Sequence, residues 1–408
     1  MRIAFVDLIF SWPPNGGADV HVFEVLRHLQ AAGHDVHLFV VHQPGSFERG
    51  RIAPDTLPFP VTRIDATLHA LAPERLCPRL RAAVDAFAPR AVFVTHGYTL
   101  KPYVLETFAD YPLVSRYYAH EAACARDPLR FKAGAPCPCH ALRTVQVCRE
   151  CAVESQREAL VSWQLATWQR DYLAAKAYAP AYAARARQAL QCAHVLVVSN
   201  AAQRAAFAPF HPRIEVIPGG VDVAAYTPAP LPHAAKKVVF MAGRGEAPTK
   251  GLSVLLDAAN RLRQHRDDFL VRATHFDPMQ SRPGFDSIGW RTGEEMRALY
   301  ADSYMVAVPS VWEEPFGLVA VEAMATGRPV LASQTGGLQD IVRHGETGLL
   351  VPPGDAEAWA GALEALLDNP ALARRMGAAG RAMVEAEYDW HVIIERHLTP
   401  LLESLCHE

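Results

Sequence analysis

Short apolar runs alternate with helical patterns along nearly the whole chain, and this alternation limits the possible folds more than any other feature. The strand-like runs span residues 3–8, 36–41, 91–95, 112–118 and 195–199 in the first half, and residues 238–242, 269–274, 305–308 and 330–333 in the second half. Strands that alternate with helices pair in parallel and are covered by helices. The pattern therefore predicts an α/β protein built on parallel sheets.

The length of the chain predicts two domains, because 408 residues exceed what one ordinary core supports. Residues 214–222 lie between the two halves and are followed by a proline-rich stretch to Pro232. This segment is expected to be an interdomain hinge. The expected domains are residues 1–213 and residues 214–388, with an amphipathic C-terminal helix over 389–408.

Composition excludes several classes of protein. Half of the residues are hydrophobic and 20% are charged, as in soluble globular enzymes, and a net charge of −3 argues against nucleic acid as a partner. The N-terminal run carries a charge and is soon followed by Trp12-Pro13-Pro14, so it predicts a first strand and no signal peptide. No run has the length of a transmembrane helix, and the expected compartment is the cytoplasm. The sequence does not predict the oligomeric state.

The segment from Ser310 to Gly337 says most about function. Pro315-Phe316-Gly317 opens a predicted helix after the strand at 305–308, and Thr326-Gly327 closes it. Glu322 adjoins the core-facing stripe of this helix and is expected to be partly buried, while Glu314 lies in the loop before it. Two acids then bracket a helix N-terminus whose N–H groups suit a phosphate, which describes a nucleotide-sugar pocket. The alternative is a solvated loop acid and a helix-surface charge.

This arrangement resembles the Glu-x7-Glu motif of the retaining glycosyltransferases of family four (group 1). The resemblance implies the GT-B fold, in which two Rossmann-like doubly wound domains face each other across a cleft and the C-terminal helix packs back on the first domain. It implies that Glu314 binds the hydroxyls of the donor sugar and Glu322 those of the ribose. The backbone that would meet the sugar and the diphosphate belongs to Phe316, Gly317, Leu318 and Val319.

The second half holds further matches to the family. Gly243-Arg244 ends a strand and Lys250-Gly251 opens a helix, which resembles the family's Gly-Arg and Lys-Gly pair, whose cations hold the departing diphosphate. No Asp-x-Asp motif is present, so no catalytic metal or other catalytic cofactor is expected. The alternative is a solvated pair of cations at a helix start. Gly289-Trp290 is similar to the segment that meets the nucleotide base, with a buried core tryptophan as the equal alternative.

The first half holds two weaker matches. Gly16-Gly17 lies between the first strand and a helix with Val20, Phe23, Leu26 and Leu29 on its predicted core face. It resembles the family's first Gly-Gly loop, beside the donor phosphates and the acceptor, although a plain tight turn would also use glycine. His120 follows a strand and matches the family's His-Asp dipeptide, with Glu121 in the second place. The resemblance gives His120 a role in holding the donor sugar; the alternative is a structural histidine.

An insert over residues 120–151 carries five of the eight cysteines. The Cys-x2-Cys spacing of two of them predicts a structural zinc site, and reduced thiols, an iron–sulfur cluster or a disulfide are the alternatives. The expected ligands are Cys124, Cys137, Cys148 and Cys151, with Cys139 as a substitute. Residues 155–191 read as helices bearing Trp163, Trp168 and Tyr172, either as core packing or as a platform for the acceptor or for peripheral membrane contact.

The sequence thus predicts a retaining glycosyltransferase that moves a glycosyl unit from a UDP- or GDP-sugar to an acceptor hydroxyl or another nucleophile, with catalysis assigned to His120, Arg244, Lys250 and Glu314. Two alternatives stay open. One is a GT-B nucleotide-sugar epimerase with a hydrolysing step, and the other is a glycosyltransferase-like subunit that binds a partner without turnover. The sugar, the nucleotide and the acceptor are not specified by the sequence.

Overall fold

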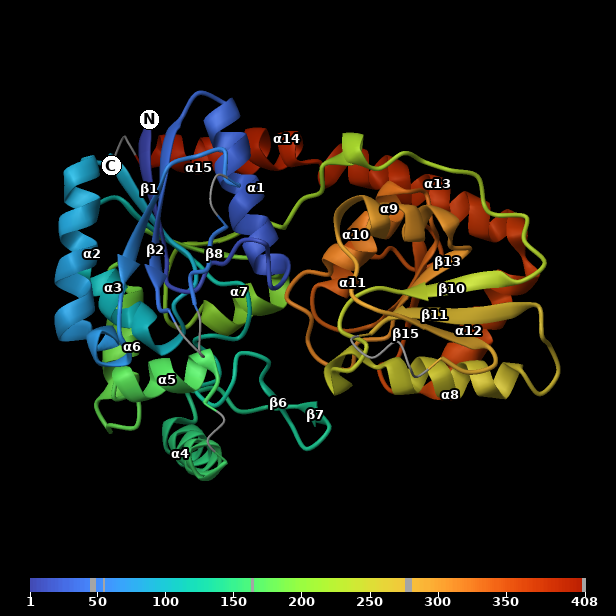
Figure 1. Ribbon diagram of the computed structural model, residues 1–408, viewed down its shortest axis with the longest axis horizontal. Helices are drawn as coiled ribbons and strands as arrows, with labels where there is room; N and C mark the ends of the chain where they lie inside the picture. The colour runs from blue at the N-terminus through green and yellow to red at the C-terminus, as the bar shows by residue number, and fades with distance from the viewer. Residues whose placement is uncertain (45–48, 54–55, 163–164, 276–280, 406–408) are drawn as a thin grey trace. The chain divides into compact units, whose positions relative to one another are not determined.

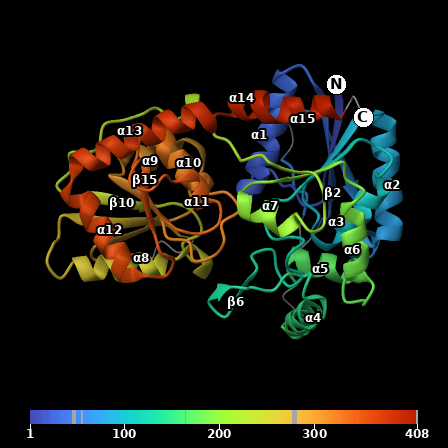
Figure 2. The ribbon, with the colours of Figure 1, turned by 180° about the vertical axis from the view of Figure 1, so that it is seen from behind.

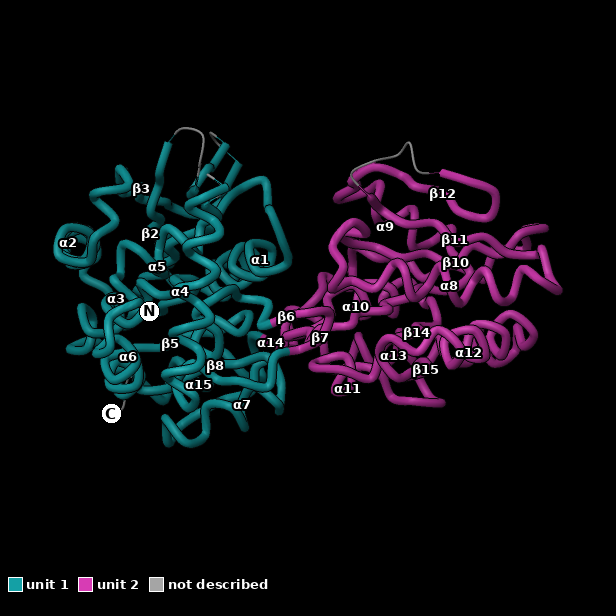
Figure 3. The backbone as a smooth tube through the Cα atoms, turned by 90° about the horizontal axis from the view of Figure 1, so that it is seen from below, with its two compact units in different colours: residues 1–130, 137–217, 394–408 teal, residues 131–136, 218–393 magenta. Residues whose placement is uncertain are grey.

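The computed structural model describes residues 1–44, 49–53, 56–162, 165–275 and 281–405. The chain divides into two compact units, which Figure 3 distinguishes by colour. The first comprises Met1–Arg130, Cys137–Ile217 and Ile394–Glu408, and the second comprises Phe131–Pro136 and Pro218–Ile393. Each unit is built on its own sheet. None of the helices in the described ranges has both the length and the apolar character needed to cross a membrane.

The first unit has a parallel sheet of seven strands among its described residues, in the order β3-β2-β1-β4-β5-β8-β9. The strands are β1 (Arg2–Asp7), β2 (Asp35–His42), β3 (Val61–Asp65), β4 (Ala91–Val94), β5 (Leu113–Arg116), β8 (Val195–Val198) and β9 (Ile214–Val216). The central strands are buried on both faces, which explains why they read as continuous apolar runs.

Helices cover both faces of this sheet, as Figure 1 and the reverse view in Figure 2 show. On one face lie α2 (Pro73–Phe87), α3 (Lys101–Thr107) and α6 (Tyr182–Leu190), and on the other lie α1 (Gly17–Ala31), α7 (Ala201–Phe207) and α15 (Thr399–Ser404). Two more helices, α4 (Val145–Val161) and α5 (Thr167–Ala174), follow the insert. The two-sided cover makes the unit doubly wound.

The second unit has a parallel sheet of six strands in the described ranges, in the order β12-β11-β10-β13-β14-β15. The strands are β10 (Lys237–Met241), β11 (Phe269–Thr274), β12 (Phe285–Ile288), β13 (Met305–Val308), β14 (Val330–Ser333) and β15 (Gly348–Val351). The helices are α8 (Leu252–Leu262), α9 (Gly293–Asp302), α10 (Leu318–Ala325), α11 (Leu338–Ile341), α12 (Ala356–Asp368), α13 (Pro370–Glu387) and α14 (Trp390–Ile393).

The two faces of the second sheet bury separate cores. Val239 and Met241 of β10 pack with α8 and α12, whereas the alternate residues Phe240 and Ala242 pack with α9, α10 and α13. Successive side chains of a strand point to opposite faces, so one apolar run supplies both cores. This unit is doubly wound as well, and the predicted α/β class with parallel sheets is confirmed.

The structure corrects several predicted elements. Residues 214–216 of the predicted hinge form β9, the edge strand of the first sheet, and the first unit continues to Ile217; the boundary at Ile217–Pro218 still falls within the predicted segment. The strands β3, β12 and β15 were also not predicted. An exposed Glu215 interrupts β9, and the exposed Asp65 ends β3, so neither strand forms an unbroken apolar run.

Helix α1 also differs from the prediction. In α1 the buried apolar residues are Val22, Val25, Leu26 and Leu29, while Val20 and Phe23 are half-buried. Phe23 instead stacks on Trp12, with ring centroids 4.1 Å apart.

The C-terminal segment is α14, a π-helical turn (Ile394–Leu398) and α15, where one regular helix over 389–408 was expected. Pro400 lacks the N–H that a regular helix would need there. Residues 406–408 lie outside the described residues.

Two helical glycines of the second unit give a paired test of this packing. A Cβ on Gly377 of α13 would lie 2.1 Å from the carbonyl oxygen of Gly327, whereas Gly361 of α12 has open space around it. We expect Gly377→Ala to lower the free energy of unfolding by about 1–3 kcal/mol through overpacking. Gly361→Ala should raise it by about 0.5–1 kcal/mol, because alanine loses less backbone entropy. Urea unfolding of both variants measures the difference, and equal effects would contradict this packing.

Candidate functional site

The carboxyl edge of the second sheet gathers the predicted donor-binding residues of that unit. A turn of 3-10 helix (Pro248–Lys250) follows β10 and brings Lys250 to the loop after β13, where Val311 N donates to Thr249 O at 2.9 Å. Gly251 closes this turn with φ +73°, and a Cβ there would lie 1.9 Å from Pro309 O. Only glycine fits this close approach, so Gly251 fixes where Lys250 lies.

Lys250 and Glu314 form an ion pair at this edge. Lys250 Nζ lies 2.6 Å from Glu314 Oε1, and Ser310 Oγ donates to the same oxygen at 2.7 Å. Glu314 is only 8% exposed, so its interpretation as a solvated loop acid is wrong. The Lys250 ammonium also lies 5.1 Å from the centroid of the Trp312 ring.

The ionisation of Glu314 follows from opposing effects. Burial alone would raise its pKa, but the charge and hydrogen bond of Lys250 and the hydroxyl of Ser310 outweigh burial and hold the pKa below the ordinary value of 4.5. Glu314 is therefore a carboxylate at neutral pH, fixed in place by groups that favour its charged form.

Glu322 lies on α10 and has a different environment. The buried Tyr300 of α9 donates its hydroxyl to Glu322 Oε2 at 2.7 Å. Burial raises the pKa of Glu322 above its ordinary value, and hydrogen bonds from Tyr300 and Tyr226 oppose this rise. The predicted partial burial of Glu322 is confirmed, and Tyr300 is a partner that the sequence analysis missed.

The N-terminus of α10 lies between the two acids in the sequence. Gly317 caps the helix with φ +118°, and a Cβ there would lie 2.6 Å from Leu338 Cδ2. Leu318 and Val319 occupy the first turn, where backbone N–H groups lack intrahelical partners. This part of the backbone can donate hydrogen bonds to an anion, as the prediction for Gly317, Leu318 and Val319 requires.

Three other glycines shape the same loop. A Cβ on Gly336 would lie 2.3 Å from Glu314 O, and Gly337 N donates to that oxygen at 2.7 Å. The pair Gly336-Gly337 therefore supports the backbone of Glu314. A Cβ on Gly219 would lie 2.8 Å from the ring of Phe316, so glycine at this position makes room for the ring.

The remaining predicted residues of this unit lie nearer the surface. Gly243 follows β10 with φ +111°, and its N–H donates to Thr274 Oγ1 at 2.8 Å; Thr274 is a positioning residue that the sequence analysis missed. Arg244 is exposed. Trp290 is 37% exposed, which excludes its interpretation as a buried core aromatic, and Gly289 beside it is half-buried.

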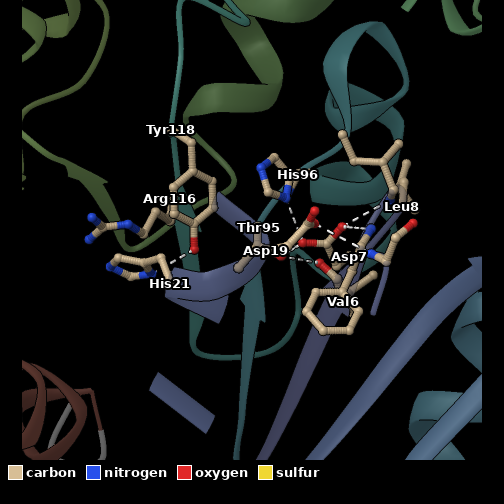
Figure 4. Close-up of polar contacts among 12 residues, drawn as sticks. Val6, Asp7, Leu8, Asp19, His21, Thr95, His96, Arg116 and Tyr118 are labelled. Atoms are coloured by element: carbon tan, nitrogen blue, oxygen red, sulfur yellow. Dashed lines mark hydrogen bonds and ion pairs between the residues drawn. The ribbon is translucent and has the colours of Figure 1, made fainter. Parts of the chain in front are cut away.

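In the first unit, a polar cluster that the sequence analysis missed lies at the carboxyl edge of the sheet (Figure 4). Asp7 ends β1 and is fully buried; its carboxylate accepts from Thr95 Oγ1 at 2.6 Å and contacts His96 Nδ1 at 2.8 Å. Burial would raise the pKa of Asp7, but His96 and the other donors lower it below the ordinary value, while Asp7 raises the pKa of His96 against the effect of burial. A buried acid at a strand end is the signal that could have revealed this cluster.

Asp19 joins this cluster to the first Gly-Gly loop. Its carboxylate accepts from Asn15 N at 2.8 Å and Ser11 N at 3.3 Å, and burial raises its pKa to about 6. Gly16 caps α1 with an extended backbone, and neither Gly16 nor Gly17 has a positive φ. The alternative of a tight turn that needs glycine therefore has no steric support at Gly16, around which space is open.

His120 follows β5 and is half-buried in a tight loop. Its N–H donates to Pro128 O at 3.0 Å, and its carbonyl oxygen accepts from Ala123 N and Cys124 N. The neighbouring Glu121 is buried and lies 3.5 Å from the ammonium of the buried Lys101. These hydrogen bonds fix the backbone of His120. His120 and the loop at Gly16 and Gly17 both belong to the first unit.

The cysteines of the insert are free thiols in the described chain. Burial raises the pKa of Cys124 to about 11, and burial together with the nearby thiols of Cys139, Cys137 and Cys151 raises the pKa of Cys148. In the parts of the chain that the structure describes, no three His, Cys, Asp or Glu side chains converge as metal ligands. The zinc site at Cys124, Cys137, Cys148 and Cys151 stays a prediction, which elemental analysis tests.

The aromatic residues after the insert divide between two environments. Tyr172 is buried in the core of the first unit, so core packing is confirmed for it. Trp168 is half-buried, and Trp163 lies outside the described residues. A platform for the acceptor or for peripheral membrane contact stays a prediction for Trp163 and Trp168.

Two doubly wound α/β units, with charged groups and a helix N-terminus at strand ends, define the class of protein: the fold is GT-B. Comparison with known proteins agrees. A family model described as "Glycosyltransferase Family 4" matches residues 15–225, and one described as "Glycosyl transferases group 1" matches residues 236–369. The chain belongs to glycosyltransferase family 4.

Individual relatives extend this result. The chain is 38% identical over 189 residues to a phosphatidyl-myo-inositol mannosyltransferase of Mycobacterium leprae, covering 43% of this chain and 50% of the relative. It is 34% identical over 226 residues to a D-inositol 3-phosphate glycosyltransferase of Pseudarthrobacter chlorophenolicus, covering 47% and 53%. The chain thus spans about half the length of the curated relatives it matches.

Solved structures share the fold at low identity. Sucrose-phosphate synthase of Thermosynechococcus elongatus matches with a TM-score of 0.71 and 21% identity over all of both chains. HepE of Anabaena, crystallised with UDP and glucose, matches with a TM-score of 0.68 and 20% identity over 99% of this chain and all of HepE.

The pairing of Lys250 with Glu314 predicts a measurable pKa change. In Lys250→Met, the ammonium no longer opposes the effect of burial, and the pKa of Glu314 should rise from its wild-type value. In the wild type its lowered pKa stabilises the fold above pH 4.5, and this stabilisation is lost as the pH falls through the folded-state value. Carboxyl 13C NMR of glutamate-labelled protein measures the shift. The exposed Lys236→Met serves as the control, and an unchanged Glu314 titration in Lys250→Met would contradict the account.

Proposed function

We propose that the chain is a retaining glycosyltransferase that moves a glycosyl unit from a nucleoside-diphosphate sugar of the UDP or GDP type to an acceptor, without a metal ion at the catalytic centre. The observation that carries the proposal is the ion pair between the half-buried Lys250 and the buried Glu314, beside the N-terminus of α10. This arrangement offers a cation and N–H groups to a diphosphate and a fixed carboxylate to the sugar hydroxyls. HepE, which shares the fold, was crystallised with UDP and glucose, and this supports a donor of the UDP type.

The charges explain how the leaving group would be stabilised. Breaking the bond from the sugar to the diphosphate places negative charge on the departing phosphate. The Lys250 ammonium has three N–H donors, of which Glu314 uses one, so it can hold the carboxylate and a phosphate oxygen together. The exposed Arg244 and the first turn of α10 would add further donors. Each ~1.4 kcal/mol of such stabilisation raises the rate about tenfold.

The proposed mechanism needs no side chain as a base. The departing phosphate takes the proton of the acceptor on the face that it leaves, and the anomeric configuration is kept. Glu314 and His120 hold the sugar, and Glu322 binds the ribose hydroxyls. The hydrogen bond from Tyr300 fixes the Glu322 carboxylate for this role. Gly16, Gly17, Gly243, Gly289 and Trp290 are proposed to contact the donor through backbone or ring surfaces. A cytoplasmic location fits this chemistry and remains a prediction.

A panel of nucleotide sugars tests the donor class. A UDP- or GDP-sugar should raise the melting temperature of the wild type, because it binds only the folded state. Slow hydrolysis of that donor should release a sugar that first keeps the donor's anomeric configuration, as NMR can follow. Lys250→Ala should abolish hydrolysis, whereas the exposed Lys236→Ala should not.

The other outcomes decide between the two alternatives. Fast release of free sugar and nucleotide, with no product formed from any acceptor, would favour the epimerase with a hydrolysing step. A thermal shift without turnover would favour a binding subunit. No shift with any nucleotide sugar would overturn the proposal.

The ribose role of Glu322 gives a separate test. Glu322→Gln retains an oxygen for the Tyr300 hydroxyl but removes the charge, and a hydrogen bond to a charged group contributes about 1.5–3 kcal/mol. The nucleoside diphosphate should therefore bind roughly 10- to 100-fold more weakly in calorimetry. Its 2′,3′-dideoxy analogue should bind wild type and variant equally, and the exposed Glu357→Gln should change neither. An equal loss for both ligands would place Glu322 away from the ribose.

A further inference from the structure

Arg116 is a buried cation that the proposed mechanism does not use. It is the last residue of β5, which lies between β4 and β8 in the first sheet, and it is 1% exposed. Its backbone oxygen accepts from the ammonium of Lys101. Figure 4 shows its side chain beside Tyr118 and His21, on the other side of the Tyr118 ring from Asp7.

The guanidinium has few partners for a group so deeply buried. Nη2 donates to Ser199 Oγ at 3.2 Å, and the guanidinium carbon lies 5.2 Å from the centroid of the Tyr118 ring. Nε and Nη1 are buried and have no hydrogen-bond partner among the described residues. Nearly all buried polar groups in folded proteins are hydrogen-bonded, so two N–H-bearing nitrogens without partners on one side chain need an explanation.

Charge balance gives the same result. The carboxylate of Asp7 is paired with His96, and that of Asp19 accepts from the backbone of Ser11 and Asn15. No described carboxylate lies within ion-pair distance of Arg116. Burial lowers the pKa of Arg116, and Tyr118 opposes this decrease. Tyr118 does not supply a negative charge, because burial raises its own pKa and keeps its hydroxyl neutral. A buried cation without an anion is unfavourable unless a ligand supplies one.

The position of Arg116 indicates which ligand that would be. The carboxyl ends of parallel strands form the ligand-binding edge of doubly wound sheets, and Ser199 directly follows β8 at this edge. We propose that Arg116, with the hydroxyls of Ser199 and Tyr118, forms an anion-binding site for a phosphate or carboxylate group of the acceptor. Assigning the anion to the acceptor rests on the proposed function. Since the guanidinium is buried, neighbouring side chains must move to admit the anion.

Thermal unfolding of the full chain tests the site. The probes are inorganic phosphate, acetate and chloride at matched ionic strength, on wild type and Arg116→Met. Phosphate or acetate should raise the melting temperature of the wild type more than that of Arg116→Met, and chloride should raise neither. Anions bound elsewhere, as at Lys250, shift both proteins equally and cancel. The probe that gives the difference distinguishes a phosphate from a carboxylate.

A second readout excludes a merely structural role. Without added anion, Arg116→Met should melt no lower than the wild type, because the variant removes an unpaired buried charge. The exposed Arg90→Met in the same unit should keep the full anion response. Arginine 15Nε NMR of the wild type gives an independent measurement that does not use Arg116→Met: one resonance that is absent from Arg116→Lys should shift on adding phosphate or acetate.

Three results would overturn the proposal: equal anion shifts in wild type and Arg116→Met, no anion shift in either protein, or a lower melting temperature for Arg116→Met without anion. In the NMR experiment, an Arg116 resonance that shifts with neither anion would also overturn the proposal. Binding of nucleotide sugars by the wild type is measured separately, so failure at Arg116 is distinguishable from failure of the proposed function.

Discussion

The ion pair between Lys250 and Glu314 is the interaction on which the candidate site depends. Burial disfavours the charged form of Glu314, and the nearby ammonium, together with the side chains of Ser310 and Trp312, keeps it ionised. The same contact holds the ammonium at the carboxyl edge of the second sheet, next to the loop that leads into α10. One pair of charges therefore fixes both a group suited to a diphosphate and a group suited to sugar hydroxyls. Neither would be held as firmly without the other.

Glycines make this pairing possible by allowing backbone segments to approach closely. Gly251 contacts the carbonyl of Pro309, and Gly336 contacts the backbone of Glu314. Each approach leaves no room for a Cβ, so the loops after β10, β13 and β14 are locked against one another. The pair Gly336-Gly337 thus supports the acid that the proposed donor would contact. Gly219 serves the Phe316 ring in the same way.

The sequence predicted the layered α/β fold because the central strands are buried on both faces and form unbroken apolar runs. Edge strands escaped prediction for the opposite reason: β9 alternates with an exposed Glu215, so residues 214–216 resembled a hinge. In the second unit, the local motifs around Lys250, Glu314 and Gly317 were readable because each lies in one short segment. The sequence did not predict their partners Ser310, Tyr300 and Thr274, because these contacts depend on which strand ends meet in the fold. The cluster around Asp7, His96 and Arg116 joins three strands and a helix: Asp7 at the end of an apolar run signals one member, but no single segment shows which residues meet it.

The central claim is that the second unit binds a nucleoside diphosphate at the strand ends, with its phosphates on Lys250 and the first turn of α10. The most direct measurement is a crystal structure of the chain with the nucleotide that gives the largest thermal shift. The account predicts phosphate oxygens within hydrogen-bond distance of Lys250 Nζ and of the backbone N–H groups at Leu318 and Val319, with the ribose hydroxyls on Glu322. A nucleotide bound with its phosphates away from Lys250 and α10 would contradict it.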